Sequence, residues 1–245
     1  MNDPVAGNEL SSQLGDLAVA CRVLAMEGHE DGTQGHLSLR DPEGRGLWLK
    51  RMGVLFGAIQ DADDFILIDF AGEILAGSGR RHAEWPIHTE IMKARPEVNV
   101  VGHGHPHFAT LFTALDEDFQ PFVQEGYRVR GHRVARYEDT STLIVSPELG
   151  QALAQSLAGD WAVFMRNHGI SFCGESIVDA TMTAVFLEKA CKAFFEIKAT
   201  GLDLRVPDAD ELKNHADIFT SDWFLADNWG YFTDKLARLE SGGRP

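Results

Sequence analysis

Short apolar segments typical of strands alternate with longer amphipathic segments along most of this chain, and few folds accommodate that alternation. Near the start an apolar residue recurs every third or fourth position, at Leu10, Leu14, Leu17, Cys21 and Leu24. That spacing predicts an amphipathic helix that ends at Gly28. Further helices are predicted over residues 84–95, 147–157 and 175–199, and strands over residues 36–40, 47–50, 65–69, 73–75, 98–103, 143–145 and 161–165. Strands interleaved with helices over 245 residues predict one layered α/β domain.

The acidic composition argues against two classes of partner. The chain carries 22 lysines and arginines against 37 aspartates and glutamates, a net charge of −15. Such a surface repels phosphate backbones and anionic lipid, so we expect no nucleic-acid partner and no membrane partner. No apolar stretch reaches the ~18 residues of a membrane-spanning helix, because Arg22 interrupts the best candidate.

The cysteines and the first ten residues indicate the cellular compartment in which the protein is expected. Cys21, Cys173 and Cys191 are odd in number, widely spaced and set among apolar residues. They are therefore predicted to be free thiols in a reducing environment rather than a disulfide framework. The first ten residues have neither the basic region nor the apolar core of a secretory signal. We expect a cytoplasmic protein.

Three histidines lie at alternate positions where one apolar strand is predicted to end. Side chains two residues apart on a strand point to the same side, so His103 and His105 can offer imidazole nitrogens to one metal ion at about 2.0–2.1 Å. Pro106 is expected to end the strand, so His107 need not share that face. Taken alone, this pair is equally compatible with a metal site and with packed or exposed histidines.

Two other segments carry polar groups at the ends of predicted elements. Arg166-Asn167-His168-Gly169 follows a short apolar strand, where Asn-His-Gly is by itself a plausible turn. Glu84-Trp85-Pro86-Ile87-His88 enters a helix, where an isolated glutamate is usually a cap or a charge that matches the helix dipole. Neither segment alone establishes a functional site.

In their order and spacing, however, these segments resemble the class II aldolase/adducin family. Gly32-Thr33-x-Gly35-His36-x-Ser38-x-Arg40 and Asp69-Phe70-x-Gly72-Glu73 match two further segments of that family. The resemblance spans about residues 10–200. It implies a single three-layer α/β/α domain with a central, mostly antiparallel sheet. It also implies a homo-oligomer, commonly a tetramer, with active sites at subunit interfaces.

By the same resemblance, residues 1–200 would be the catalytic domain. His103, His105 and His168 would bind one divalent metal ion per subunit, namely Zn2+, Mn2+ or Co2+, with Fe2+ as a further option. Glu84 would be the nearby acid/base. Three imidazoles leave coordination positions open for a substrate, as in a catalytic rather than a structural site.

The chain departs from the sugar-phosphate aldolases at the positions that hold the substrate phosphate. Where those enzymes carry small hydroxyl- and amide-bearing residues, this sequence concentrates basic ones: His36, Arg40, Lys50, Arg51, Arg80, Arg81 and His82. Each lysine or arginine singly is best interpreted as a solvated surface charge, but arginine forks match planar carboxylates well. The aldolase tyrosine that crosses the subunit interface also has no counterpart at Gln124-Glu125. These departures favour a small-molecule carboxylate substrate.

The resembled family also contains metal-dependent decarboxylases of hydroxylated aromatic or pyridine dicarboxylates, which match the basic segments better. We therefore expect a lyase that removes CO2 from such an acid, with Glu84 or a histidine delivering a proton to the product. The expected substrate contacts are His36, Ser38, Arg40, Arg51, Arg81 and His82. Three alternatives stay open: a class II (retro-)aldolase acting on a hydroxy-keto acid or sugar phosphate, a mononuclear iron oxygenase, and a non-catalytic adducin-like binding module.

Residues 201–245 are expected to form an acidic loop and then an aromatic helix that carries Trp223, Phe224, Trp229, Tyr231 and Phe232. We expect this helix to pack on the same domain or on a neighbouring subunit. A lid over an aromatic substrate is the alternative.

Overall fold

The computed structural model describes residues 8–129 and 133–243. Within them, eight strands form one sheet in the order β4-β3-β2-β1-β5-β8-β7-β6. The strands are β1 (His36–Arg40), β2 (Leu47–Lys50), β3 (Phe65–Ile68), β4 (Ile74–Ala76), β5 (Val100–Gly104), β6 (Ala135–Tyr137), β7 (Ala162–Met165) and β8 (Gly169–Gly174). All neighbouring strands pair antiparallel except β6 and β7, which are parallel. The expected mostly antiparallel sheet is confirmed.

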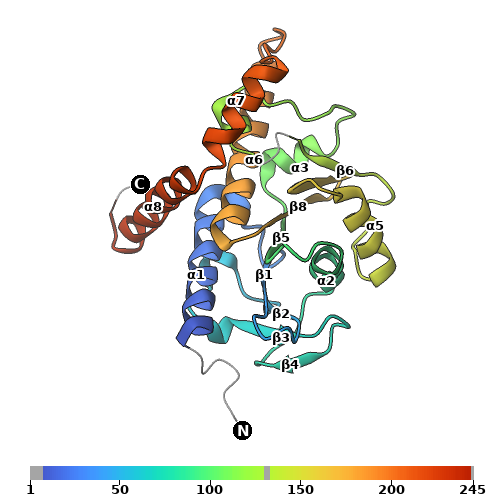
Figure 1. Cartoon of the computed structure of the whole chain (residues 1–245), viewed down its shortest axis with the longest axis vertical. Helices are drawn as coiled ribbons and strands as arrows, with labels where there is room; N and C mark the ends of the chain where they lie inside the picture. Colours follow the sequence, from blue (N-terminus) through green and yellow to red (C-terminus); the bar gives the residue numbers. More distant parts are fainter. Residues whose placement is uncertain (1–7, 130–132, 244–245) are drawn as a thin grey trace.

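Helices cover both faces of the sheet, which gives three layers (Figure 1). One face carries α1 (Asn8–Leu24), α3 (His107–Phe112), α6 (Ile177–Lys198) and α8 (Asp222–Glu240), and the other carries α2 (Trp85–Ala94) and α5 (Pro147–Leu157). Alternate residues of each strand point to opposite faces. Leu37 and Leu39 of β1 accordingly join the core under α1 and α6, which leaves His36 and Ser38 facing α2. The three-layer α/β domain is confirmed.

The strand predicted at residues 143–145 is wrong. Leu143 and Val145 are exposed and Ile144 is buried, so the burial alternates as in a strand, but the described residues include no strand that pairs with this segment. The backbone N–H of Ile144 donates instead to Oε1 of Glu84, at 2.8 Å. The segment is therefore a loop that is held by the side chain of Glu84. The sequence pattern also did not predict β6 and β8.

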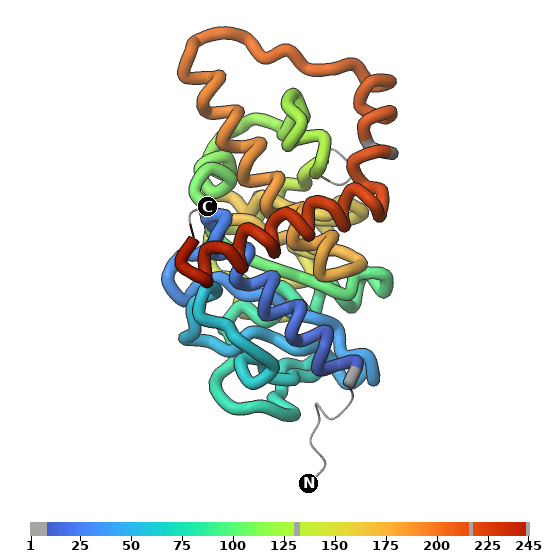
Figure 2. The backbone as a smooth tube through the Cα atoms, turned by 90° about the vertical axis from the view of Figure 1, so that its left-hand side faces the viewer, coloured from blue at the N-terminus to red at the C-terminus, as the bar shows by residue number. Residues whose placement is uncertain are grey.

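The last forty-odd residues form two helices rather than the expected one. α7 (Ala209–Phe219) packs near the short α4 (Gln124–Tyr127), where the rings of His215 and Tyr127 stack with centroids 4.5 Å apart. Figure 2 shows the chain leaving α6, turning down through α7 and returning across α1 and α6 as α8. Phe232 of α8 is buried against α6 of the same chain. No helix in the described part of the chain combines the length and apolar character needed to cross a lipid bilayer.

Candidate metal centre and active site

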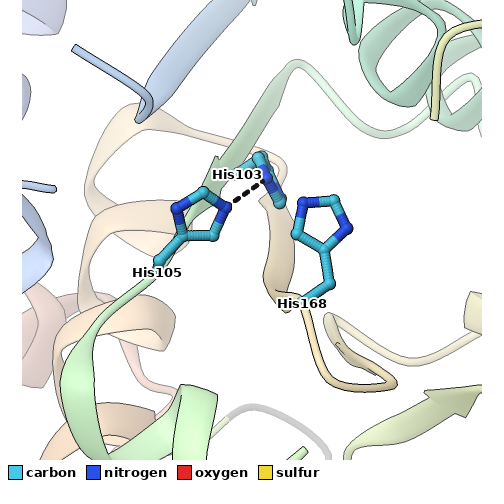
Figure 3. A group of neighbouring side chains, drawn as sticks. All are labelled: His103, His105 and His168. Atoms are coloured by element: carbon cyan, nitrogen blue, oxygen red, sulfur yellow. Dashed lines mark hydrogen bonds between the residues drawn. The ribbon is translucent and has the colours of Figure 1, made fainter. Parts of the chain in front are cut away.

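Three imidazoles from two distant segments face one point (Figure 3). His103 lies in β5 between β1 and β8, and His105 follows the last residue of that strand. His168 lies in the turn from β7 to β8, where Asn167 adopts a φ of +53°. One ligand nitrogen from each of these histidines lies within 4.8 Å of the other two. The structure thus brings together the three residues that the family resemblance implies.

The hydrogen bonds fix which nitrogen of two of these rings is free. Nδ1 of His103 donates to the carbonyl oxygen of Ile170 at 2.9 Å, and Nδ1 of His105 donates to a carboxylate oxygen of Asp31 at 3.0 Å. Both Nε2 atoms therefore present lone pairs, and they lie 3.2 Å apart. At that distance either a proton, in a hydrogen bond between the two rings, or a metal ion can lie between the two nitrogens. Tetrahedral ligands at about 2.0–2.1 Å from a metal are about 3.3–3.4 Å apart, so the pair fits one ion.

The third ring supports the same interpretation. Within the described residues, both ring nitrogens of His168 are buried without a hydrogen-bond partner. Unpartnered buried polar atoms are rare because they lose their hydration without compensation. Gly169 follows His168, and a Cβ at that position would lie 2.5 Å from Cδ2 of His105. The glycine of the Asn-His-Gly turn therefore makes room for the second ligand ring.

Glu84 lies directly beside the three imidazoles. Its Oε2 is 3.6 Å from Nε2 of His103, and its Oε1 is 3.7 Å from Nε2 of His168. Its side chain makes no capping hydrogen bond to the start of α2 in the described structure, which argues against a simple helix cap. Burial raises the pKa of this carboxyl, so it holds a proton to higher pH than an exposed glutamate. A carboxyl of this kind can act as a proton donor.

Further buried imidazoles extend from His103 toward α2. The ring of His36 lies 5.0 Å from that of His103 and 4.5 Å from that of His82, measured between centroids. Nδ1 of His36 lies 2.6 Å from Nε2 of His88, whose Nδ1 lies 2.7 Å from Oγ of Ser38. Ser38 donates its one hydroxyl proton to the carbonyl oxygen of Val101, so it accepts from His88. His88 then accepts from His36, which leaves Nε2 of His36 with a lone pair.

The histidines beside His103 are neutral at ordinary pH. Burial is the main reason that the pKa of His36 lies well below its usual range, and burial lowers the pKa values of His82 and His88 to about 3. One ligand atom each from His36, Glu84 and His103 also lie within 4.8 Å of one another. The free nitrogens of His36 and His82 can therefore accept hydrogen bonds or bind a cation, but these rings carry no positive charge.

Two of the expected substrate contacts lie elsewhere. Ser38 is fully buried behind His88. Arg40 lies at the other end of β1, four residues and about 13 Å of strand from His36. Its guanidinium donates to the backbone carbonyls of Met92, Arg95 and Val98, where α2 ends. The structure therefore gives both side chains other partners: Arg40 holds the end of α2, and Ser38 orients His88.

The remaining basic residues lie on two loops that touch. The backbone N–H of Met52 donates to the carbonyl oxygen of Arg80 at 2.8 Å, which joins the loop of Arg51 to the loop of Arg81 and His82. Arg51 pairs with Asp64, and Arg81 lies over the ring of Trp85. Each of Arg51, Arg81 and His82 retains one buried nitrogen without a partner among the described residues. A Cβ at Gly72, in the turn after β3, would lie 2.8 Å from Nη1 of Arg81, so the guanidinium of Arg81 lies beside that turn. We call Arg51 and His82 the basic corner, and the ring of His82 connects it to His36.

One residue beside the site, Asp31, could not be predicted from the sequence. Asp31, an exposed residue of the loop before β1, gives no sign in the sequence that it contacts a histidine 74 positions away. His88 lies one helical turn after Glu84 on the same face, a spacing that fits either support of the site or simple packing. Its hydrogen bonds to His36 and Ser38 favour a role in orienting His36.

Comparisons with known proteins agree with this geometry. A sequence model of the family described as "Class II Aldolase and Adducin N-terminal domain" matches residues 15–195. The meiotically up-regulated gene 14 protein of Schizosaccharomyces pombe is 31% identical over 182 residues, which cover 73% of this chain and 70% of that protein. The 3,4-dihydroxyphthalate decarboxylase of Arthrobacter keyseri is 27% identical over 215 residues, covering 79% and 82%. The solved L-fuculose 1-phosphate aldolase of Glaciozyma antarctica PI12 superposes with a TM-score of 0.82 at 24% identity, covering 99% and 96%.

Proposed function

The chain belongs to the class II aldolase and adducin family, and from that membership we propose that it is a divalent-metal-dependent lyase that removes CO2 from a hydroxylated aromatic or heteroaromatic carboxylate or dicarboxylate. One observation carries the proposal: neutral imidazoles lead from His103 to the basic corner of Arg51 and His82. That arrangement would place a carboxylate site beside a metal site. The similarity to a 3,4-dihydroxyphthalate decarboxylase supports the same substrate class.

His103, His105 and His168 would hold one divalent ion per subunit. Imidazole ligands accept Zn2+, Mn2+, Co2+ and Fe2+, so the donor set does not select among them. Bound there, the ion would act as a Lewis acid on a ring hydroxyl and the neighbouring carboxylate of the substrate. The chain would work in the cytoplasm as a homo-oligomer, a tetramer by resemblance to the family. Residues 1–200 would form the catalytic domain, with 201–245 packed upon it.

Glu84 would supply the proton that replaces CO2. When the bond between the ring carbon and the carboxylate breaks, its electron pair remains on the ring carbon, which then takes up one proton. Oε1 of Glu84 is held by the N–H of Ile144, so Oε2 is the oxygen free to carry that proton. The raised pKa of Glu84 favours the protonated form that this step requires. Solvent would then reprotonate the carboxylate.

The basic corner would hold a second carboxylate of a dicarboxylate substrate. The guanidinium of Arg51 would pair with it, because its planar fork matches a carboxylate. Nε2 of His82, buried and without a partner in the described structure, would contact a further polar atom of the substrate. The lone pair on Nε2 of His36, between this corner and His103, would accept a hydrogen bond from a substrate hydroxyl.

The test is release of CO2 by metal-loaded enzyme. Protein stripped of metal and reloaded with Mn2+, Co2+ or Zn2+ is incubated with 3,4-dihydroxyphthalate, other hydroxylated benzoates and hydroxypyridine dicarboxylates, and loss of CO2 is followed by mass spectrometry. Glu84→Gln, which keeps the acceptor for Ile144, should lower the rate by about 10²–10⁴-fold. Glu90→Gln is the matched control, a buried glutamate of α2 paired with Lys93.

Three outcomes would contradict the proposal. Cleavage of hydroxy-keto acids or sugar phosphates to an aldehyde without CO2 would indicate an aldolase. Oxygen consumption with Fe2+ would indicate an oxygenase. Failure of the wild-type protein to bind any of these ions would indicate a binding module.

A further inference from the structure

The sheet holds the backbone of His103 but not that of His105, because β5 ends at Gly104. His103 lies inside β5, paired with His36 of β1 and Ser171 of β8. His105 follows Gly104, where β5 ends, and precedes Pro106, which has no backbone N–H to donate. The chain then continues directly into α3, only six residues long. The position of His105 therefore depends on how the start of α3 is held.

The start of α3 has no local cap. Pro106 occupies the N-cap position, and no side chain there accepts from the first N–H groups of the helix in the described structure. The first turn of a helix leaves N–H groups that require acceptors from elsewhere. A short helix without such acceptors frays at its first turn, which here adjoins the metal ligand.

Glu188, in the middle of α6, accepts from two of these N–H groups. Its Oε1 accepts from the N–H of Phe108 at 2.9 Å, and its Oε2 accepts from the N–H of Ala109 at 2.7 Å. The residue is 8% exposed and lies some 80 positions away in the sequence. A carboxylate at a helix N-terminus is also stabilised by the helix dipole. One side chain thus fixes the two N–H groups that begin three residues after His105.

We propose that Glu188 is a positioning residue for the metal ligand His105. Its carboxylate anchors the start of α3 to α6, and this anchor holds the His105 ring so that its Nε2 faces that of His103 (Figure 3). The inference depends on the metal site of the proposed function but not on the reaction. Glu188 touches neither imidazole, so it acts only through the backbone of residues 106–109.

The experiment compares Glu188→Gln with Asp179→Asn. Asp179 is the matched control, because it is a buried carboxylate of the same helix that accepts a backbone N–H, from Glu175, at the other end of β5 from His103. In Glu188→Gln the amide oxygen replaces only one of the two accepting oxygens, and the amide NH2 faces the other N–H donor. Glu188→Asp keeps the charge but is shorter by one methylene. All variants are made in the full chain.

Two readouts separate positioning from general stability. Co2+ binding to apo protein is titrated by visible ligand-field absorption, without substrate. Glu188→Gln should weaken Co2+ binding by about 10–100-fold and change the spectrum, as loss of outer-shell support does in metal sites. Glu188→Asp should fall between that variant and wild type, and Asp179→Asn should bind as wild type does. In the apo state, amide hydrogen exchange should accelerate at Phe108 and Ala109 in Glu188→Gln only.

The inference is overturned if Glu188→Gln binds Co2+ with wild-type affinity, or if Asp179→Asn loses as much affinity at a similar loss of thermal stability. Neither result touches the proposed decarboxylation, which is measured separately as CO2 release. Conversely, wild-type protein that binds Co2+ but releases no CO2 removes the reaction and leaves the role of Glu188 intact. If wild type binds no Co2+, both proposals fall.

Discussion

Nε2 of His103 and Nε2 of His105 face each other at 3.2 Å, while each ring donates from Nδ1 to an oxygen elsewhere. The partners differ in kind. His103 is held by a backbone carbonyl of the adjacent strand, whereas His105 is held by the carboxylate of Asp31. A carboxylate that accepts from a ligand histidine fixes its tautomer and increases the basicity of its other nitrogen. The two candidate ligands therefore depend on different parts of the chain.

Asp31→Asn should weaken metal binding without unfolding the protein. The amide oxygen can still accept from Nδ1 of His105, but the negative charge that raises the basicity of the ring is lost. We expect about a 10–100-fold rise in the dissociation constant for Zn2+ or Co2+, measured by competition with a chelator. Glu30→Gln is the matched control, because Glu30 is an exposed carboxylate of the same loop that accepts from Gly57 instead. Equal affinities for the Asp31 and Glu30 variants would show that the carboxylate does not support the ligand.

Arg51 and Arg40 should respond in opposite ways to the same substitution. Arg51→Met should raise KM for a dicarboxylate about 10–100-fold, because a charge-assisted hydrogen bond contributes about 1.5–3 kcal/mol. It should leave KM for the analogue that lacks the second carboxylate unchanged. Arg40→Met should instead leave both KM values unchanged and lower the free energy of unfolding by about 1–3 kcal/mol, because three carbonyls lose their donor. A rise in KM for the dicarboxylate in Arg40→Met would instead indicate that Arg40 contacts the substrate.

The buried histidines should make the apo protein sensitive to acid. The pKa of His88 is lowered from 6.5 to about 3, so at acidic pH the folded protein binds fewer protons than the unfolded chain. The corresponding stability is complete above pH 6.5 and is lost as the pH falls toward 3, by about 1.4 kcal/mol per pH unit for each such group. Urea unfolding at several pH values between 7 and 4.5 measures this slope.

A glutamine at position 88 removes one of these groups. His88→Gln should reduce the slope of unfolding free energy against pH, although it lowers stability at pH 7 by breaking the hydrogen bonds to His36 and Ser38. His107→Gln, at an exposed histidine, should leave the slope as in wild type. An unchanged slope in the His88 variant would mean that His88 is not the group that takes up the proton.

Local sequence patterns predict most of the fold, because a helix or strand that is buried on one face repeats its apolar residues with its own period. The helix from Pro147 to Leu157 begins with Ser146 as cap and proline at its first position, and its predicted bounds are confirmed. Residues 143–145 show where the pattern fails. Their alternation of burial is that of a strand, but pairing is a long-range property, and here the acceptor is the side chain of Glu84. Hydrophobic periodicity cannot distinguish a strand paired in a sheet from a loop that is held by a side chain.

The site was predictable to the extent that its residues form local patterns. His103 and His105 follow from the two-residue period of a strand, and His168 from the order of segments in a family. Asp31 and Glu188 show no such pattern, because they approach His105 and α3 only when loops and helices far apart in the sequence fold together. The position of Arg40 could not be predicted for the converse reason. Its sequence neighbours belong to the site, but Arg40 lies at the far end of β1, where its side chain contacts the end of α2.

The glycine after His168 gives a steric test of the metal centre. An alanine Cβ at position 169 would lie 2.5 Å from Cδ2 of His105 and 2.6 Å from the backbone oxygen of Gly104, so the ring and the end of β5 must move apart. Gly169→Ala should therefore weaken Co2+ binding at least about tenfold, since a misplaced ligand cannot complete the metal geometry. Gly159→Ala is the control, because no atom of the described structure lies within 4 Å of a Cβ there. Isothermal titration of both variants with Co2+ distinguishes the cases, and wild-type affinity in Gly169→Ala would mean that His105 is not held against this turn when the ion binds.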